Sequence, residues 1–472
     1  MKDSGISFEK VLDRVSELDP AHNPAFSSLD DIASGQLFAH VFKDVARFNT
    51  TSNTWMSYNG QIWQKDEGSV QAESRAKDLA RAVYLYGADQ SREFQKYAYK
   101  LQSRNGRNIM LRDAIDSFPV SSKSFDQDLD LFNIQNGIYN LHTGELMKHD
   151  AGMLLSKIAN ASYMPEARSE LFERFISEIF EDDQDRIRYV QKLFGYAMTG
   201  DNCEEQAYLF YGPKTRNGKS TLLETVAHML GDYALNMSPD TLAQKPRDSR
   251  SPSGDIARLD GCRFLHASEP PKRMLFDVAL LKTLLGRDKI TARHLHEREF
   301  EFVPRFVLFI NTNYLPLVND DTLFSSGRIK VVTFDRHFSE AEQDRSLKRR
   351  LKTKDNLSGI FNWCLEGLRL YREEGLEPPP AVVRATADYR EQSDKIGLFV
   401  AEELERDEDS TISGGFLYRR YSDWCEANGY GTESKRNFFA ELKNKGLLSD
   451  TGTIGGQTVH NVVRGWAVNR DQ

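Results

Sequence analysis

The sequence has few cysteines, no long apolar run and no excess of basic residues. Its four cysteines are widely spaced and form no Cys-x-x-Cys pair: Cys203, Cys262, Cys364 and Cys425. This spacing argues against a structural zinc site and indicates a reducing compartment. No run approaches the roughly 20 apolar residues of a membrane-spanning helix, and the N-terminus lacks the apolar stretch of a secretory signal. We therefore expect a cytoplasmic protein with no membrane partner.

The formal net charge of the 472-residue chain is −8, which is not the pattern of a protein covered with basic residues for nucleic acid. If the protein binds DNA, its basic side chains must be gathered in one place, such as a channel or a small module. The chain is also too long for a single hydrophobic core, so several domains are expected.

The expected fold class is α/β, built on a parallel sheet flanked by helices. Four near-continuous apolar runs predict strands buried on both faces: Tyr208–Tyr211, Phe264–Ala267, Phe306–Ile310 and Ile329–Phe334. Helical spacing of apolar residues predicts helices over 168–200 and 340–400. We divide the chain into an α+β N-terminal domain (1–160), a helical lead-in (161–204), a motor (205–340), a helical region (341–400) and a C-terminal domain (401–472).

The flanking domains carry weaker signals. Trp55–Trp63 predicts a hairpin with an Asn59-Gly60 turn. The Pro378–Pro380 run is expected to end a helix sharply, and the acidic stretch Glu402–Asp409 to form a solvated helix end or a linker. Residues 412–469 then predict two helices and a β-hairpin, an order that resembles a winged helix.

A phosphate-binding loop is the strongest motif of the chain. An apolar strand leads into a Gly/Pro turn and then into Gly-Lys-Ser and a helix. Glycine lets backbone N–H groups turn toward phosphate oxygens, and the helix adds its positive N-terminal end. Five residues, rather than the usual four, separate the two glycines. The residues expected to bind ATP are Gly212, Pro213, Lys214, Thr215, Arg216, Asn217, Gly218, Lys219, Ser220 and Thr221.

Catalysis needs further groups at the ends of neighbouring strands. Lys219 is expected to reach the β- and γ-phosphates, and the Ser220 hydroxyl to ligate Mg²⁺. Glu269 follows the strand Phe264–Ala267 and is the expected acid for Mg²⁺ and for activating the attacking water. Asn313 follows the next strand, where an amide can bind the water or the γ-phosphate. The alternatives are that Glu269 is a surface residue at a strand end and that Asn313 only forms a turn.

Arg328 precedes the last strand of the predicted sheet. In ring ATPases an arginine at this place neutralises charge at the neighbouring subunit's nucleotide. A surface salt bridge is the alternative interpretation, because nothing in the local sequence shows which role applies.

Together these motifs resemble the phage and plasmid primase-helicases, a branch of the superfamily 3 helicases. Gly-Pro-x-x-x-Asn-Gly-Lys-Ser is similar to the loop of that branch, including its additional residue. The segments 281–304, Asn313-x-x-Pro316 and 328–334 resemble the other motor motifs, and 136–144 resembles the short domain before the motor in the poxvirus and phage proteins. The likeness covers most of the chain and is most specific in the motor.

The resemblance implies an AAA+-like core that forms a homo-oligomeric ring, a hexamer in this family, which uses ATP and Mg²⁺ to move on DNA. It also implies a channel hairpin over roughly 290–302, with His294, His296 and Arg298 near its tip as DNA contacts, and Lys282 near the subunit interface. A bacterial cytoplasm and a phage or mobile-element origin follow from the resemblance alone.

Two features bear on alternative functions. No paired acids or cysteine cluster suited to nucleotide polymerisation precedes the motor, so we expect no primer synthesis by this chain and a separate primase or loader as partner. Lys435 and Arg436 begin the second helix of the C-terminal domain and are candidate DNA contacts, although such modules also dock proteins. The leading hypothesis is a DNA helicase. A replication initiator or loader switched by ATP, and a nucleotide-switched scaffold, are the alternatives.

Overall fold

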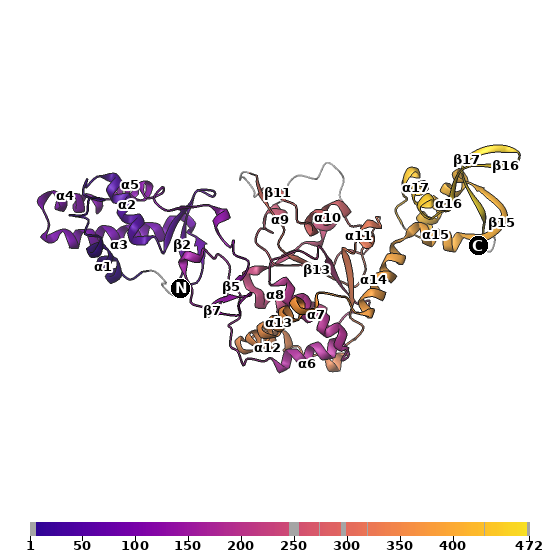
Figure 1. Ribbon diagram of the computed structural model, residues 1–472, viewed down its shortest axis with the longest axis horizontal. Helices are drawn as coiled ribbons and strands as arrows, with labels where there is room; N and C mark the ends of the chain where they lie inside the picture. Colours follow the sequence, from indigo (N-terminus) through magenta and orange to yellow (C-terminus); the bar gives the residue numbers. More distant parts are fainter. Residues whose placement is uncertain are drawn as a thin grey trace.

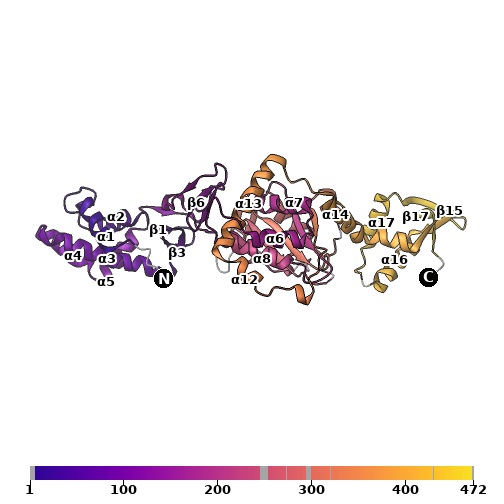
Figure 2. The same ribbon diagram turned by 90° about the horizontal axis from the view of Figure 1, so that it is seen from below.

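The computed structural model describes residues 6–244, 254–272, 274–293, 299–318, 320–428 and 430–469. The chain forms three units along one long axis, with a central sheet between an N-terminal and a C-terminal unit (Figure 1). The turned view keeps this order (Figure 2). None of the described helices is long and apolar enough to cross a membrane.

The central sheet has five parallel strands in the order β14-β8-β13-β10-β9. This confirms the predicted parallel sheet and its four apolar strands. The strands are β8 (Ala207–Tyr211), β9 (Ala234–Met237), β10 (Phe264–Ser268), β13 (Val307–Thr312) and β14 (Ile329–Thr333). Strand β9 was not predicted, because it lies at the sheet edge and only one of its four residues is buried.

Helices cover both faces of this sheet. One face carries α6 (Glu170–Ile179), α7 (Gln184–Ala197), α8 (Lys219–Leu230), α12 (Leu347–Leu351) and α13 (Lys354–Glu374). The other carries α9 (Gly254–Ala257), α10 (Val278–Leu285), α11 (Thr322–Ser325), α14 (Pro380–Ser393) and the hairpin β11 (Ile290–Ala292) with β12 (Phe300–Phe302). The layer on the first face thus combines helices that precede the sheet in sequence, α6 and α7, with helices that follow it, α12 and α13.

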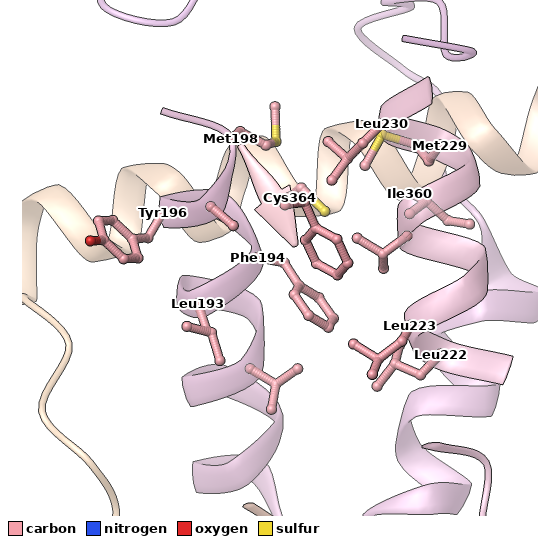
Figure 3. Packing of buried hydrophobic residues seen from close by; sticks show 14 of the residues in the cluster. Leu193, Phe194, Tyr196, Met198, Leu222, Leu223, Met229, Leu230, Ile360 and Cys364 are labelled. Carbon is pink, nitrogen blue, oxygen red and sulfur yellow. The ribbon is translucent and has the colours of Figure 1, made fainter. Parts of the chain in front are cut away.

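The first of these layers is packed closely enough to hold the phosphate-loop helix rigidly. Phe194 of α7 lies between α8 and α13 (Figure 3), and its ring contacts those of Phe210 and Phe309 on the sheet. Helices α7 and α13 touch through their backbones, since a Cβ at Gly367 would lie 1.9 Å from the Gln191 carbonyl oxygen. A larger residue at this glycine would therefore push the two helices apart.

The N-terminal unit combines helices with two small sheets, ordered β3-β2-β1-β4 and β5-β6-β7. The Trp55–Trp63 hairpin is confirmed by the pairing of β2 with β3. The elements are α1 (Phe8–Leu18), α2 (Asp31–Phe42), β1 (Ala46–Asn49), β2 (Thr54–Tyr58), β3 (Trp63–Lys65), α3 (Val70–Tyr86), α4 (Arg92–Leu101), α5 (Arg104–Asp113), β4 (Pro119–Val120), β5 (Leu131–Ile134), β6 (Gly137–Asn140) and β7 (Leu146–Met147).

Arg263 ties this unit to the central sheet. The side chain is buried at the start of β10 and donates to the carbonyl oxygens of Leu131 (3.1 Å) and Met198 (2.6 Å). Its guanidinium also lies 4.8 Å from the centre of the Tyr233 ring. Burial lowers the pKa of Arg263, and carbonyl oxygens and aromatic faces compensate its charge.

The C-terminal unit has its own core, formed by α15 (Lys395–Glu403), α16 (Gly414–Ala427), α17 (Lys435–Asn444) and the sheet β15-β17-β16. Its strands are β15 (Leu404–Ser413), β16 (Leu448–Ile454) and β17 (Gln457–Val468). Because α15 packs into this core, the unit begins before residue 401. The two helices and the hairpin predicted over 412–469 are present.

Two predictions in this part of the chain were wrong. The acidic stretch Glu402–Asp409 is mostly strand, because Leu404–Arg406 pair with β17 and Arg406 lies over the Trp466 ring. A register shift after Arg406 leaves the remaining acids at the solvent side. The proline run begins a helix instead of ending one, since α14 starts at Pro380, where a helix needs no backbone N–H. The preceding helix ends at Glu374, before Gly375.

Candidate functional site

The phosphate-binding loop, residues 212–220, joins the carboxyl end of β8 to the first turn of α8. Gly218 caps the helix with a φ of 86°, in the left-handed region that favours glycine, and a Cβ there would lie 2.4 Å from Ile179 of α6. Residues 213–216 are exposed, whereas Asn217 and Lys219 are buried. The loop is therefore exposed to solvent along residues 213–216, whereas the side chains of Asn217 and Lys219 are held in the interior.

Lys219 is buried, with 3% of its surface exposed, and its partners are all neutral. Its Nζ donates to Asn217 Oδ1 and Asn313 Oδ1, each at 2.9 Å, and to the Gly212 carbonyl oxygen at 3.2 Å. Burial lowers the pKa of Lys219 to about 8, and the charge of Glu269 opposes that shift. The amine is thus a cation surrounded by oxygen dipoles, with no carboxylate bonded to it among the described residues.

Asn311 is a site residue that sequence reasoning missed. Its Nδ2 donates to Ser220 Oγ at 2.9 Å, directly beside the Lys219–Asn313 contact. Asn311 and Asn313 lie two residues apart at the end of β13, so strand alternation places both on the α8 side. Applying the same two-residue period to Asn311-Thr312-Asn313 would have identified it.

Glu269 follows β10 at the same edge of the sheet. Its backbone N–H donates to the Asn311 carbonyl oxygen at 2.9 Å, and its φ of 58° lies in the left-handed region. This conformation is unusual for a glutamate and indicates a constrained backbone at this strand end, and the charge of Glu269 acts on the Lys219 amine. The structure therefore brings together Lys219, Ser220, Glu269 and Asn313, as the sequence predicted for neighbouring strand ends.

A segment after β14 supports the loop from behind and was not predicted. His337 Nδ1 donates to the Thr215 carbonyl oxygen at 2.7 Å, and the Phe338 N–H to that of Arg216 at 2.9 Å. Arg216 also pairs with Glu340 at 3.4 Å and has a φ of 59°. These contacts fix the outer part of the loop, which has one more residue than the usual motif.

Arg328 is not part of this cluster. It precedes β14, at the amino edge of the sheet, and its carbonyl oxygen accepts from the Ala207 N–H at the start of β8. Its guanidinium pairs with Glu205 at 2.5 Å and donates to the Lys282 carbonyl oxygen at 3.4 Å. The Lys282 amine in turn pairs with Asp320 at 3.3 Å. Arg328 and the phosphate loop thus lie at opposite ends of the same strands.

The other predicted contacts are divided between described and undescribed residues. His294, His296 and Arg298 lie outside the described residues, and only the paired ends of their hairpin, β11 and β12, are described. Lys435 and Arg436 are exposed at the start of α17, and the Lys435 amine lies 5.9 Å from the Phe439 ring centre. Two further cations, Lys443 in the last turn of that helix and Lys445 directly after it, are paired with Asp450 and Asp394, respectively.

Three family models match separate parts of the chain. Residues 35–181 match "D5 N terminal like" and residues 391–447 match "Poxvirus D5 protein-like". Residues 210–328, which hold the loop and both asparagines, match a family of unknown function, DUF5906. Two of the three models describe D5-like proteins, so the chain is similar to the D5-like primase-helicases.

The curated proteins similar to this chain come from viruses. It is 26% identical over 359 residues to "Putative helicase L207/L206" of Acanthamoeba polyphaga mimivirus, covering 71% of this chain and 37% of that protein. It is 29% identical to "Putative helicase 022R" of Frog virus 3, covering 55% and 28%. For "Putative primase C962R" of African swine fever virus the identity is 20%, with coverages of 75% and 39%. The chain spans less than half the length of each of these proteins.

Among solved structures, this chain is similar to the C-terminal region of NrS-1 in its apo form, at 12% identity. The alignment covers 89% of this chain and 96% of that one, with a TM-score of 0.48.

Proposed function

We propose that this chain is the ATP-hydrolysing motor of a DNA helicase that acts in replication of a virus, phage or other mobile element. The observation that carries the proposal is the buried amine of Lys219, held by Asn217 and Asn313 at the end of a parallel sheet and at the first turn of α8. A phosphate group is the ligand that a cation and free helix N–H groups at this edge would bind. The viral relatives named as helicases support the same conclusion.

Each residue of the cluster has a distinct proposed task. Lys219 binds the β- and γ-phosphates and offsets charge that develops on them during hydrolysis. Asn313 orients that amine and, from the same position, binds the attacking water. Glu269 accepts the proton of that water, for which its place at the end of β10 is suited.

The donor set fits Mg²⁺ bound together with ATP. Ser220 Oγ is already oriented by Asn311 Nδ2, and Glu269 is an acid whose charge acts on the neighbouring Lys219. The described residues contain no group of three or more carboxylate, histidine or cysteine ligands. Ser220 and Glu269 would therefore supply few of the ligands, and phosphate oxygens and water the others, as is usual for Mg²⁺. Bound Mg²⁺ would supply charge neutralisation at the phosphates.

The position of Arg328 supports a homo-oligomeric ring, with a hexamer as the family's form. The five-residue strand β8 separates the Arg328 edge from the loop edge by about 15 Å, so Arg328 serves a nucleotide of the neighbouring subunit rather than its own. The core is AAA+-like in this proposal. The β11–β12 hairpin, with His294, His296 and Arg298, would face DNA in the channel.

The C-terminal unit is proposed to be a winged helix. Its order of helix, strand, two helices and two strands supports this, with α17 as the second helix before the hairpin. Lys435 and Arg436 are the cations of α17 without an ion pair among the described residues, which makes them its candidate DNA contacts.

Strand displacement from a forked DNA duplex, with ATP and Mg²⁺, tests the proposal. Wild-type protein should separate the strands, and Lys219→Ala should not. ATP hydrolysis and DNA binding without displacement would favour the alternative, an ATP-switched initiator or loader. The separate core of the C-terminal unit favours that alternative because such a module can select a DNA site by itself. Origin-specific binding would support it, and a helicase that needs a separate loader or primase would regain activity when that partner is added.

A further inference from the structure

Helices α3, α4 and α5 of the N-terminal unit concentrate basic residues in an acidic protein. Residues 70–112 contain nine arginines and lysines but only four aspartates and glutamates, whereas the whole chain has 62 basic and 70 acidic residues. The motor chemistry uses none of these residues. Both views place α4 at the end of the N-terminal unit that is farther from the central sheet (Figures 1 and 2).

One face of α4 combines cations with an exposed aromatic ring. A shallow depression of about 510 Å³ is lined by Arg92, Lys96, Tyr99 and Lys100, together with Gln95. Residues 92, 96 and 99–100 follow one another at helical spacing, so they share one face. The Tyr99 side chain is 72% exposed. An aromatic ring so far out of the core has no packing role, and it lies among three positive charges.

A second depression lies between α3 and α5 and is lined mainly by polar residues. Its volume is about 240 Å³, and Lys77, Arg104 and Arg107 line it opposite the single acid Glu73. Arg104 begins α5 only four residues after Lys100 of α4, so cations of the two depressions lie close together in the sequence. We call the residues that line the two depressions the α3–α5 surface.

Most cations of the α3–α5 surface are not neutralised within the chain. Lys100 pairs with Asp31 at 2.8 Å, and Arg107 donates to the Gln102 carbonyl oxygen. Among the residues that the structure describes, Lys77, Arg92, Lys96 and Arg104 have no carboxylate within ion-pair distance. Unpaired surface cations grouped in this way raise the local concentration of an anionic partner.

We propose that the α3–α5 surface binds single-stranded nucleic acid, with the cations on the phosphates and a base stacked on Tyr99. Exposed aromatic rings between cations fit an unpaired strand, because the base faces of a duplex are already covered by their neighbours. The binding does not depend on ATP chemistry at Lys219. It would give the chain a nucleic-acid contact outside the motor, and this contact would guide one strand toward the motor or away from it.

The test uses the full chain without nucleotide and a fluorescent oligothymidylate of about 20 nucleotides. The variant Lys96→Glu/Arg104→Glu reverses two unpaired cations of the surface. The matched control Lys123→Glu/Lys148→Glu makes the same change of net charge at exposed lysines elsewhere in the N-terminal unit. We expect the first variant to bind about tenfold more weakly and the control to bind like wild type. The slope of log affinity against log salt should fall by about 1.4, since about 0.7 is lost for each phosphate contact.

Stacking is tested separately. Tyr99→Ala should weaken binding about fivefold or more, as for loss of one stacked base, whereas Tyr84→Ala, which removes an exposed tyrosine of α3, should not. Ultraviolet crosslinking of a bromodeoxyuridine-substituted strand should label the peptide containing α4. Thermal unfolding and DNA-independent ATP hydrolysis should be unchanged, because all these side chains are exposed.

Three results would overturn the proposal. One is equal affinity of the Lys96→Glu/Arg104→Glu variant and wild type, and another is an equal loss in the control variant. The third is competition by polyglutamate as strong as that by unlabelled strand, which would make an acidic protein segment the partner. Failure of the proposed motor is a separate outcome: wild type would then hydrolyse no ATP, yet its nucleotide-free binding would still depend on Lys96 and Arg104.

Discussion

Lys219 and Arg328 are two cations at opposite edges of one sheet, and their partners differ in charge. Lys219, at the carboxyl edge, is buried and bonded to three neutral oxygens. Arg328, at the amino edge, has 23% of its side chain exposed and is paired with the Glu205 carboxylate. The first positive charge thus has no carboxylate bonded to it among the described residues, and the second is already paired with one.

This difference indicates how each cation gains by binding an anion. Burial penalises the charged amine of Lys219 and lowers its pKa to about 8, so a phosphate at this point relieves a cost that the fold already bears. Arg328 gains only if another anion replaces Glu205 or shares its guanidinium. The carboxyl edge is therefore suited to bind a phosphate by itself, and the amino edge to respond when a neighbouring subunit arrives.

Removing the Lys219 charge should have the largest effect. Lys219→Met keeps the length of the side chain but leaves the three oxygens without a donor. We expect kcat/KM for ATP hydrolysis to fall by at least about 10³-fold, because both phosphate binding and transition-state stabilisation lose their cation. Lys354→Met, at the exposed start of α13, is the control and should hydrolyse ATP like wild type. Normal hydrolysis by Lys219→Met would mean that the site is elsewhere.

Arg328→Ala should separate binding from turnover. Its own nucleotide site is intact, so ATP binding should stay within about twofold of wild type, while kcat falls by about 10³-fold if the guanidinium acts in trans. Mixing it with Lys219→Ala subunits should restore part of the activity, since mixed interfaces combine an intact loop with an intact arginine. Absence of rescue at every mixing ratio would contradict shared sites.

The sequence predicted the parts of this site that depend on short segments. The turn, Lys219 and the acids and amides at strand ends are each local patterns, and Lys219 does meet Asn313 at 2.9 Å. Asn311 was overlooked because a polar residue at a strand end is usually a turn former. Its bond to Ser220 depends on β13 lying next to β8, which only the assembled sheet determines.

The remaining differences come from pairings between distant segments. Strand β9 is only partly buried and forms because β10 offers it an edge. The support of the loop by His337 and Phe338 joins residues more than a hundred positions apart. The acidic stretch became strand because β17 pairs with it, which outweighs the low strand propensity of aspartate and glutamate. The prediction from charge alone, a solvated helix end or a linker, was therefore wrong for that segment.

The lowered pKa of Lys219 predicts a pH dependence of nucleotide binding. Phosphate favours the charged amine and raises its pKa, so affinity should be highest below pH 8 and fall as the free protein loses this proton above it. We expect ADP affinity to drop about tenfold between about pH 7.5 and about pH 9.5, measured by calorimetry. The weak residual binding of Lys219→Met should not change over this range. An equal decline in that variant would assign the titration to another group.

Replacing Glu205 should have the smallest effect and addresses the amino edge directly. Glu205→Gln removes the carboxylate charge beside Arg328 while keeping a hydrogen-bond acceptor, and a partly exposed pair contributes only about 0–1 kcal/mol to the free energy of unfolding. With its guanidinium released, Arg328 should engage a neighbouring subunit more readily, so half-maximal ATPase activity should need about twofold less protein.

Glu204→Gln is the matched control, because that neighbouring carboxylate accepts from Tyr371 instead of Arg328. Its concentration dependence should equal that of wild type. If Glu205→Gln instead lost as much activity as Arg328→Ala, Glu205 would be needed to position the arginine for its neighbour. The partners of Lys219 and Arg328 would then both serve to orient the cation. Pairing with Glu205 would not keep Arg328 from binding another anion.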